Sequence, residues 1–322
     1  MDKRILILTD GKAGHENQSK AFARALGLPF DLLEVHFRGP FHKALSYLLD
    51  RFGVLSPALF GGRAVLDRAR PPDGSAYAAV LGTGSGTFYA AKTLARRLGA
   101  KCGVVLYPRG YRVSTFDCVL APAFDRPPAA ANVVEIPANL VANDETFYAA
   151  GTEAFLARHH AAPAAVAVIV GGPNKCSTMT ADWMREQLTR LFAEHGHPAY
   201  ATESAAAEPP EFWVTTSRRT PPEVEAVVDA FPFDYKLLYS KDHFNPIPAF
   251  VSLAKVLYVT AESTGMLSEA CTFGTAEVRV MDNLNPGPHK FRRFAESCAA
   301  LGRRKIDLSG PFAAAKALLL PA

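Results

Sequence analysis

Short runs of apolar and β-branched residues recur along the chain, and most are followed by Gly, Pro, Asn or small polar residues. Runs of about four to eight such residues, bounded by turn-forming residues, are typical of buried strands. Longer stretches with apolar residues at helical spacing separate them. Strands are predicted at 5–9, 31–36, 78–82, 102–107, 117–121, 132–136, 166–170, 212–216, 235–239, 256–259 and 276–281. This alternation predicts an α/β fold with parallel sheets.

The length of the chain predicts two domains. Its 322 residues exceed what one hydrophobic core usually serves. A helix predicted over 143–160 runs into the Ala- and Pro-containing segment 159–163, where we expect the boundary between domains 1–160 and 161–322. The final apolar segment, 312–320, could cross back to the first domain. We expect each sheet to open a ligand crevice at its carboxyl edge, with the two crevices facing a central cleft.

The stretch 256–271 has the strongest pattern for binding an anion. A buried strand is followed by the small and polar residues 260–265, and from Met266 the apolar residues fall on one helical face. The free N–H groups and the dipole at such a helix start favour a phosphate. Glu269 would lie about 6 Å further along the helix and could accept from ribose hydroxyls. The candidate donor-binding residues here are Glu262, Ser263, Thr264, Gly265, Met266 and Glu269; the alternative is an ordinary β-α unit with a polar cap.

The loop after the first predicted strand offers a general base. Gly11 and Gly14 allow a sharp turn in the segment 10–19, with Gly14 near an approaching substrate. His15 then lies at the carboxyl edge of the sheet, where an imidazole can accept a proton at neutral pH. Asp10 is the second candidate base, although Asp before Gly is also typical of a turn. The alternative for His15 is a cap or surface residue.

Two further loops in the second half complete the candidate site. Gly171, Gly172 and Lys175 follow the strand 166–170, where the backbone and the ammonium group could approach a sugar or phosphate. Ser217, Arg218 and Arg219 follow the strand 212–216, and Thr220 is expected to cap the next helix. Cations at a helix start conflict with its dipole, and a bound polyanion would resolve that conflict. The alternative is an exposed pair of arginines.

Composition narrows the possible functions. No apolar run approaches the ~18 residues of a membrane span, and the chain begins directly with a strand-like segment, which suggests a cytoplasmic location. The five cysteines are scattered, as buried thiols in a reducing compartment would be. No Cys or His spacing indicates zinc, and no Asp-x-Asp pair is present, so we expect no metal and no cofactor. The formal net charge of +4 is small, and we expect no nucleic-acid partner.

The segment 37–60 combines clustered Phe, Leu and Tyr residues with interleaved Arg, His and Lys. An amphipathic segment on an anionic membrane has this pattern, and so does a helix packed on the sheet. The loop 82–86, with its three glycines, leads to a predicted helix over 88–98 that carries Lys92, Arg96 and Arg97. Its glycines could hold a phosphate or leave room for an acceptor.

The motifs at 9–19, 214–221 and 259–270 together resemble the mitochondrial-fission ELM family, which is grouped with glycosyltransferases. The segments 171–175, 245–246 and 292–294 match in order and spacing, so that the resemblance covers nearly the whole chain. It implies a GT-B fold, with two Rossmann-like domains that bind an acceptor and a nucleotide sugar. The layout is also similar to the lipid-linked N-acetylglucosaminyltransferase of peptidoglycan synthesis. Cys176 departs from the pattern, which has His there.

These patterns together predict a metal-independent glycosyltransferase. A nucleotide-sugar donor would bind in the second domain, and a glycan or lipid-linked acceptor in the first, with possible peripheral membrane contact through 37–60 on the inner face of the membrane. One alternative is a hydrolysing nucleotide-sugar epimerase, which would use carboxylates such as Asp10, Glu16 and Glu262. The other is a membrane-associated adaptor without enzymatic activity.

Overall fold

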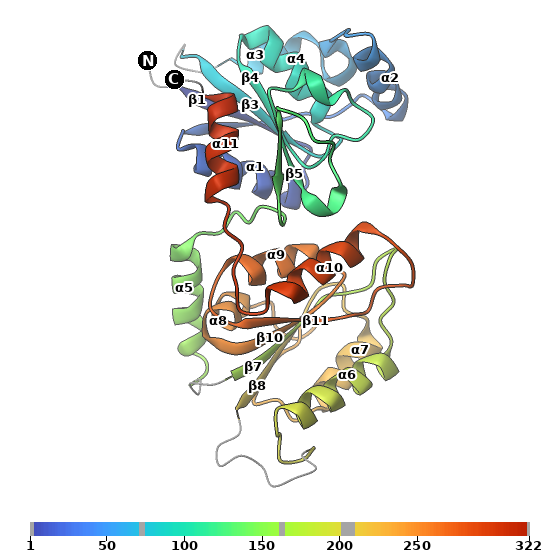
Figure 1. Cartoon of the computed structure of the whole chain (residues 1–322), viewed down its shortest axis with the longest axis vertical. Coiled ribbons are helices and arrows are strands. Elements are labelled where there is room, and N and C mark those ends of the chain that lie inside the picture. Colours follow the sequence, from blue (N-terminus) through green and yellow to red (C-terminus); the bar gives the residue numbers. More distant parts are fainter. Residues whose placement is uncertain (1–2, 71–74, 161–164, 201–209, 321–322) are drawn as a thin grey trace. The chain divides into compact units, whose positions relative to one another are not determined.

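The computed structural model describes residues 3–70, 75–160, 165–200 and 210–320. The chain forms two compact units. Unit 1 comprises residues 1–142 and 307–322, and unit 2 comprises residues 143–306. Both units consist of a parallel sheet with helices on its faces, and α11, at the red end of the sequence, belongs to unit 1 (Figure 1).

Unit 1 contains a six-stranded parallel sheet with the strand order β2-β1-β3-β4-β5-β6. Because β2 lies on one side of β1 and β3 on the other, the strand order reverses between β1 and β3. The strands are β1 (Arg4–Thr9), β2 (Phe30–Glu34), β3 (Tyr77–Thr83), β4 (Lys101–Val105), β5 (Cys118–Pro122) and β6 (Val133–Ile136). The helices are α1 (Ala13–Leu26), α2 (Pro40–Arg51), α3 (Arg63–Arg68), α4 (Phe88–Leu98) and α11 (Ser309–Leu319), with 3₁₀ turns at Pro57–Phe60, Val113–Thr115 and Ala123–Asp125.

The side-chain alternation of β1 explains how unit 1 is layered. Ile5 and Ile7 point to one face of the sheet, in a core with α1 and α11, while Leu6 and Leu8 point to the other, with α3 and α4. All four side chains are at most 1% exposed. A strand covered on both faces reads as a continuous apolar run, as the sequence of β1 does.

Unit 2 contains a five-stranded parallel sheet with the order β11-β10-β7-β8-β9. Its strand order reverses between β7 and β10, as that of unit 1 does between β1 and β3. The strands are β7 (Ala165–Val170), β8 (Glu211–Thr216), β9 (Tyr235–Leu237), β10 (Ala254–Thr260) and β11 (Glu277–Met281). The helices are α5 (Glu145–Leu156), α6 (Ala181–Glu194), α7 (Pro222–Ala230), α8 (Ile247–Leu253), α9 (Thr264–Thr272) and α10 (Lys290–Leu301).

The expected helices and strands are present, with differences at the domain boundary and at the ends of some elements. The structure divides the chain at 142/143 instead of at 160, because α5 packs against α8 and belongs to unit 2. Residues 161–164 of the expected linker lie outside the described residues. The helix after Pro246 ends at Leu253, before the expected Lys255, because the chain joins the sheet at Ala254.

One face of the unit 2 sheet is packed with aromatic rings. The Phe155 ring of α5 lies 5.1 Å from the Trp213 ring of β8 and 5.9 Å from the Phe250 ring of α8, centroid to centroid. All three side chains are fully buried. Such aromatic contacts add to the free energy gained by removing the rings from water.

We predict that Phe155→Ala lowers the free energy of unfolding by about 3–5 kcal/mol, because it removes a buried ring and leaves a cavity. Urea unfolding followed by the fluorescence of Trp213 measures the change. Phe147→Ala, on the same helix, is the matched control: Phe147 is 39% exposed, and its replacement should cost less than about 1 kcal/mol. Equal losses from the two variants would show that α5 does not pack as described.

Candidate active site

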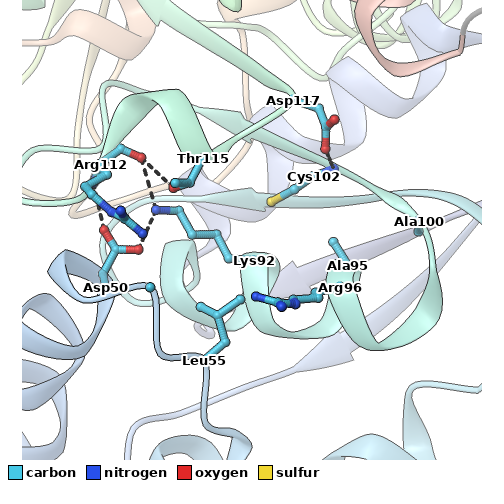
Figure 2. Close-up of a pocket in the computed structure, with 11 residues that line it drawn as sticks. Asp50, Leu55, Lys92, Ala95, Arg96, Ala100, Cys102, Arg112, Thr115 and Asp117 are labelled. Atoms are coloured by element: carbon cyan, nitrogen blue, oxygen red, sulfur yellow. Dashed lines mark hydrogen bonds and ion pairs between the residues drawn. The ribbon is translucent and has the colours of Figure 1, made fainter.

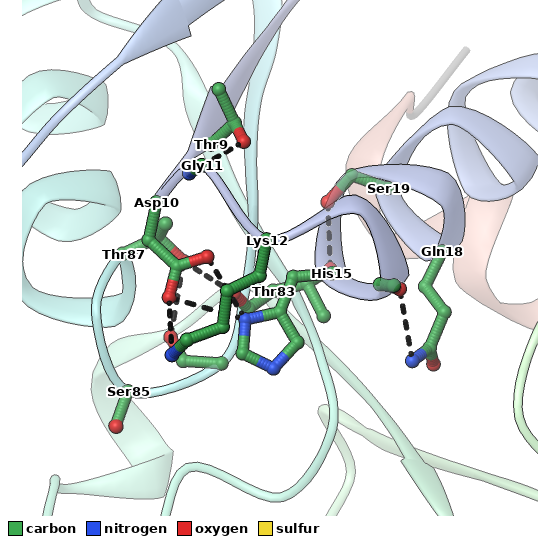
Figure 3. A network of polar contacts seen from close by, with 12 residues as sticks. Thr9, Asp10, Gly11, Lys12, His15, Gln18, Ser19, Thr83, Ser85 and Thr87 are labelled. Carbon is green, nitrogen blue, oxygen red and sulfur yellow. Dashed lines mark hydrogen bonds and ion pairs between the residues drawn. The ribbon is translucent and has the colours of Figure 1, made fainter. Parts of the chain in front are cut away.

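The carboxyl ends of β1 and β3 bring a His–Asp pair together in unit 1. His15 Nδ1 lies 3.0 Å from Asp10 Oδ1 and 3.2 Å from Oδ2. Lys12 Nζ lies 3.0 Å from Asp10 Oδ2, the same oxygen that His15 Nδ1 approaches at 3.2 Å (Figure 3). The pair lies where the strand order reverses, which is the position of the ligand crevice in open α/β sheets. Sequence reasoning treated Asp10 and His15 as competing bases, whereas the structure pairs them.

Two glycines of the loop after β3 make room for this pair. A Cβ at Gly84 would lie 2.4 Å from the His15 ring, and one at Gly86 would lie 2.7 Å from an oxygen of Asp10. Gly84 also has φ +80°, a conformation that side chains other than glycine rarely adopt. Because Gly84 and Gly86 have no side chains, the His15 ring and the Asp10 carboxylate can lie directly against this loop.

The environment of Asp10 favours its ionised form. Burial raises the pKa of this carboxyl group, but hydrogen bonds from Lys12 and His15 outweigh burial and hold the pKa below its ordinary value. A carboxylate accepts a hydrogen bond from Nδ1–H, so the neutral ring carries its lone pair on Nε2. Among the residues that the structure describes, Nε2 has no hydrogen-bond partner. His15 is 25% exposed, so the arrangement can accept a proton from an incoming hydroxyl.

The helix after β1 begins earlier than the sequence suggested. Lys12 is the N-cap residue and Ala13 the first helical residue of α1, so His15 lies in the first helical turn and not in a long loop. Gly14 precedes it, and a Cβ at Gly14 would meet nothing within 4 Å. Packing within the described protein therefore does not require a glycine at this position.

In unit 2, the loops after β7 and β10 also approach each other closely, at the point where the strand order reverses. The backbone N–H of Gly171 donates to Thr260 Oγ1 at 2.9 Å, and that of Gly172 donates to Glu262 Oε1 at 2.7 Å. A Cβ at Gly171 would lie 2.0 Å from that same Glu262 oxygen. These contacts join the loops after β7 and β10, and Glu262, 3% exposed, stands in their middle.

The loop after β8 supports the glycine loop, which corrects the expectation for Thr220. Thr220 Oγ1 donates to the Gly171 carbonyl at 2.6 Å, whereas α7 has Pro221 as its N-cap residue and no side-chain cap. Arg219 Nη1 donates to the Gly172 carbonyl at 3.1 Å, and Ser217 Oγ accepts from the Arg219 N–H. The neighbouring Arg218 is exposed, with no partner in the described parts of the chain.

The first turn of α9 has free donors, as the sequence predicted. Ser263 is the N-cap residue but makes no side-chain cap, and its helix begins at Thr264. Within the described ranges, the N–H groups of Gly265 and Met266 have no acceptor. Lys175, in the loop after β7, is exposed and likewise has no partner among the described residues. Two free N–H groups and the helix dipole favour an anion at this end of α9.

Glu269 is held by a contact that the sequence did not predict. The Tyr148 hydroxyl of α5 donates to Glu269 Oε1 at 2.8 Å, and the Tyr148 ring stacks on Phe273 with 4.4 Å between centroids. Burial raises the pKa of Glu269 and exceeds the opposing effect of its hydrogen bonds with Tyr148 and Asn143. The role of Glu269 in binding ribose stays a prediction.

Two buried polar side chains after β10 and β11 have atoms without hydrogen-bond partners among the described residues. Asn283, 4% exposed, has neither its Oδ1 nor its Nδ2 atom hydrogen-bonded, and Glu262 Oε2 is also unpaired, within the described residues. Thr260 pairs with Met281 in the β10–β11 register, so Glu262 and Asn283 follow adjacent strand ends. A buried polar group without a partner costs about 1–3 kcal/mol, which a ligand can recover. Sequence reasoning missed Asn283, whose only signal was its position directly after a strand.

Among the described residues, no three His, Cys, Asp or Glu side chains group as metal ligands. In the same residues, no helix has the length and apolar character required to cross a membrane.

Two Rossmann-like units, with the C-terminal helix in the first, define a GT-B class α/β protein. The model of the family described as mitochondrial fission ELM1 matches residues 13–309, and the chain therefore belongs to that family. No curated protein sequence matches the chain.

Solved structures of similar fold include nucleotide-sugar enzymes. The S. aureus MnaA–UDP structure is 12% identical, with a TM-score of 0.48, covering 99% of this chain and 88% of that one. UDP-GlcNAc 2-epimerase from Neisseria meningitidis, bound to UDP-GlcNAc, is 12% identical, with a TM-score of 0.48 and coverages of 99% and 97%. Acinetobacter baumannii MurG is 12% identical, with a TM-score of 0.42 and coverages of 98% and 94%.

We predict that Asn283→Leu leaves the free energy of unfolding of the free protein unchanged or raises it, because the variant removes a buried amide without partners. If the amide serves a ligand, the same variant should weaken nucleoside-diphosphate binding by about 10–100-fold. Chemical unfolding and isothermal titration with UDP measure the two effects. A variant that loses stability and keeps its affinity would assign Asn283 a structural role only.

Proposed function

We propose that the protein is a metal-independent glycosyltransferase that moves a sugar from a nucleotide-sugar donor to a hydroxyl group of a glycan or lipid-linked acceptor. The observation that carries the proposal is the Asp10–His15 pair, with His15 Nε2 free at the reversal point of unit 1. Transfer requires a base there, and it requires a donor held by unit 2 to present its anomeric carbon to the acceptor.

The reversal point of unit 2 supplies the charge that a diphosphate leaving group requires. The first turn of α9 offers the N–H groups of Gly265 and Met266, and Ser263 and Thr264 lie beside them. Arg218 and Lys175 are cations on the neighbouring loops, both without a described partner. Donors arranged before the reaction stabilise the charge that develops on the leaving group.

In the proposed reaction, His15 Nε2 takes the proton of the acceptor hydroxyl as the acceptor oxygen bonds to the anomeric carbon. The bond from that carbon to the diphosphate oxygen breaks, and the nucleoside diphosphate leaves with the electron pair. Asp10 acts as a positioning residue that holds the ring by Nδ1 and stabilises the imidazolium that forms.

Glu269 would bind the donor ribose. Its Oε1 atom is occupied by the Tyr148 hydroxyl, which fixes the carboxyl group on α9. In this proposal the second oxygen accepts from a ribose hydroxyl, and the Tyr148 contact limits the rotamers of the Glu269 side chain.

Most carboxylate oxygens that an epimerase would use already have partners, with Glu262 Oε2 the exception among the described residues. Glu16 pairs with Lys20 at 2.6 Å, Asp10 binds His15, and Glu262 Oε1 accepts from Gly172 N–H. These contacts favour transfer over epimerisation. A membrane adaptor without enzymatic activity would have no use for the free Nε2 of His15, which argues against that alternative.

We also propose that the protein contacts the inner, cytoplasmic face of a membrane through the segment 37–60, which contains α2. Helix α2 buries polar residues, Ser46 and Asp50, and exposes apolar ones: Phe41 is 72% exposed, Leu48 53% and Phe52, just beyond the helix, 72%. Arg38 and Arg51 are exposed near its two ends. Apolar side chains flanked by cations suit an anionic lipid surface.

The membrane contact predicts that Phe41→Ser/Phe52→Ser lowers co-sedimentation with phosphatidylglycerol-containing vesicles at least about tenfold, because two large apolar side chains no longer enter the lipid. Phe147→Ser, which also replaces an exposed Phe, is the matched control and should bind as the unmodified protein does. Equal binding by both variants would contradict the α2 contact.

The main test of the proposed reaction is His15→Ala. We expect the turnover of UDP-sugars with lipid-linked acceptors to fall about 10²–10⁴-fold, the usual contribution of a general base. Donor affinity should be unchanged, because the donor-binding groups belong to unit 2. Asp10→Asn should reduce turnover less, since it keeps the base. A His15→Ala variant with most of its turnover would place the base elsewhere.

The same assay, run in EDTA, tests independence from metal ions. The positive charge of Arg218, Lys175 and the α9 terminus takes the place of a divalent ion in the proposal. Turnover should therefore persist. Activity lost in EDTA and restored by Mg²⁺ would contradict this part of the proposal and leave the role of His15 standing.

A further inference from the structure

A polar cavity lies in unit 1, away from the loops that hold Asp10 and His15. Its volume is about 270 Å³, many times the ~30 Å³ that one water occupies in the liquid. It lies toward the edge where β4 and β5 begin, as the lining residues Cys102 and Asp117 show. Figure 2 shows Lys92 extending from α4 toward Arg112 and Asp50, with Arg96 beside Leu55.

Both carboxylates of the cavity wall are already neutralised. Asp50 accepts from Lys92 Nζ at 2.6 Å and from the Arg112 N–H at 2.7 Å. Asp117 accepts from Lys101 Nζ at 2.8 Å and from the Cys102 N–H at 2.8 Å. Neither carboxylate is therefore free to balance a further cation.

Two guanidinium groups in the wall have no carboxylate partner among the described residues. In the described ranges, the side chains of Arg96 and Arg112 form no ion pair or hydrogen bond with the protein. Both residues are exposed at the mouth of the cavity. Arg96 also lines a neighbouring surface pocket, together with Arg97. Together with Lys101, which pairs with Asp117 from outside the lining, the wall thus carries an excess positive charge of two, and Arg97 is a further cation nearby.

The buried ion pair gives this wall a fixed geometry. Lys92 is 4% exposed, donates to the Arg112 carbonyl at 3.1 Å and lies 4.1 Å from the centre of the Phe116 ring. Its contact with Asp50 joins α4 to the end of α2. Buried ion pairs add little net stability but restrict the arrangements a core can adopt. Here the pair holds the Arg112 backbone beside the cavity.

We propose that this cavity binds a phosphate ester group through Arg96 and Arg112. Guanidinium groups match phosphate oxygens with paired, charge-assisted hydrogen bonds. The rim is apolar on one side, where Leu55 lines the cavity and its neighbours Phe52 and Val54 are 72% and 46% exposed. A phospholipid headgroup and a soluble phosphate ester share this chemistry. The inference does not depend on the proposed transfer reaction.

The test uses the full-length protein with the double variant Arg96→Gln/Arg112→Gln. Arg303→Gln/Arg304→Gln, two exposed arginines of unit 2, is the control with the same loss of charge. Calorimetry with glycerol 3-phosphate probes the soluble source. Flotation with phosphatidylcholine vesicles, with and without phosphatidic acid, probes the lipid source. Circular dichroism verifies that each variant is folded.

If the inference is right, the cavity variant raises the Kd for at least one probe by about 10–100-fold, and the control variant does not. Loss of glycerol 3-phosphate binding identifies a soluble ligand. Loss confined to phosphatidic acid vesicles identifies a lipid headgroup. Two results would overturn the inference: no binding of either probe, or equal affinity in the cavity and control variants. Vesicle binding that depends on Phe41 and Phe52 but not on Arg96 and Arg112 would leave the α2 contact standing and exclude the phosphate site.

Discussion

The candidate site in each unit depends on glycines that let a side chain lie against the backbone of a neighbouring loop. In unit 1, the His15 ring occupies the space that a side chain at Gly84 would fill, and Asp10 does the same at Gly86. In unit 2, Glu262 occupies the space next to Gly171. Parallel strands place these loops together at the point of strand-order reversal, but only residues without a Cβ let them close to hydrogen-bonding distance. The same constraint therefore fixes the Asp10–His15 pair in unit 1 and the glycine loop after β7 in unit 2.

Some polar groups of unit 2 make hydrogen bonds that fix the shape of these loops, whereas others are buried without a partner in the described structure. Thr220 and Arg219 bind the carbonyls of the glycine loop, and their bonds account for its shape. Asn283 and one oxygen of Glu262 are buried and unpaired in the described structure. Proteins rarely leave such groups unpaired, because each costs about 1–3 kcal/mol. Both groups follow adjacent strand ends, β10 and β11, which makes this edge of the unit 2 sheet the candidate ligand position.

Local patterns predicted the strands and the start of α9 well, because burial on both faces and helix periodicity depend on near neighbours in the sequence. The helix 88–98 was predicted with its observed bounds. The pairing of Asp10 with His15 depends on how the first turn of α1 begins, and the role of Thr220 depends on a carbonyl 49 residues away. The Tyr148–Glu269 contact spans 121 residues and makes α5 part of unit 2, which a linker of Ala and Pro could not indicate. Contacts between distant segments decide these features, and a single sequence does not show them.

Helix α2 has both buried polar residues and exposed apolar ones. Its 12 residues direct Asp50 and Ser46 inward, where Asp50 meets Lys92 and Ser46 shares a hydrogen bond with the Tyr111 hydroxyl at 2.8 Å. Leu45 and Leu49 pack against the core beside them, whereas Phe41 and Leu48 remain outside. In water, this arrangement leaves apolar area exposed that the core of unit 1 does not cover. Covering these exposed side chains with a second surface would lower the free energy, and in the proposed membrane contact that surface is an anionic lipid layer, which the flanking Arg38 and Arg51 match in charge.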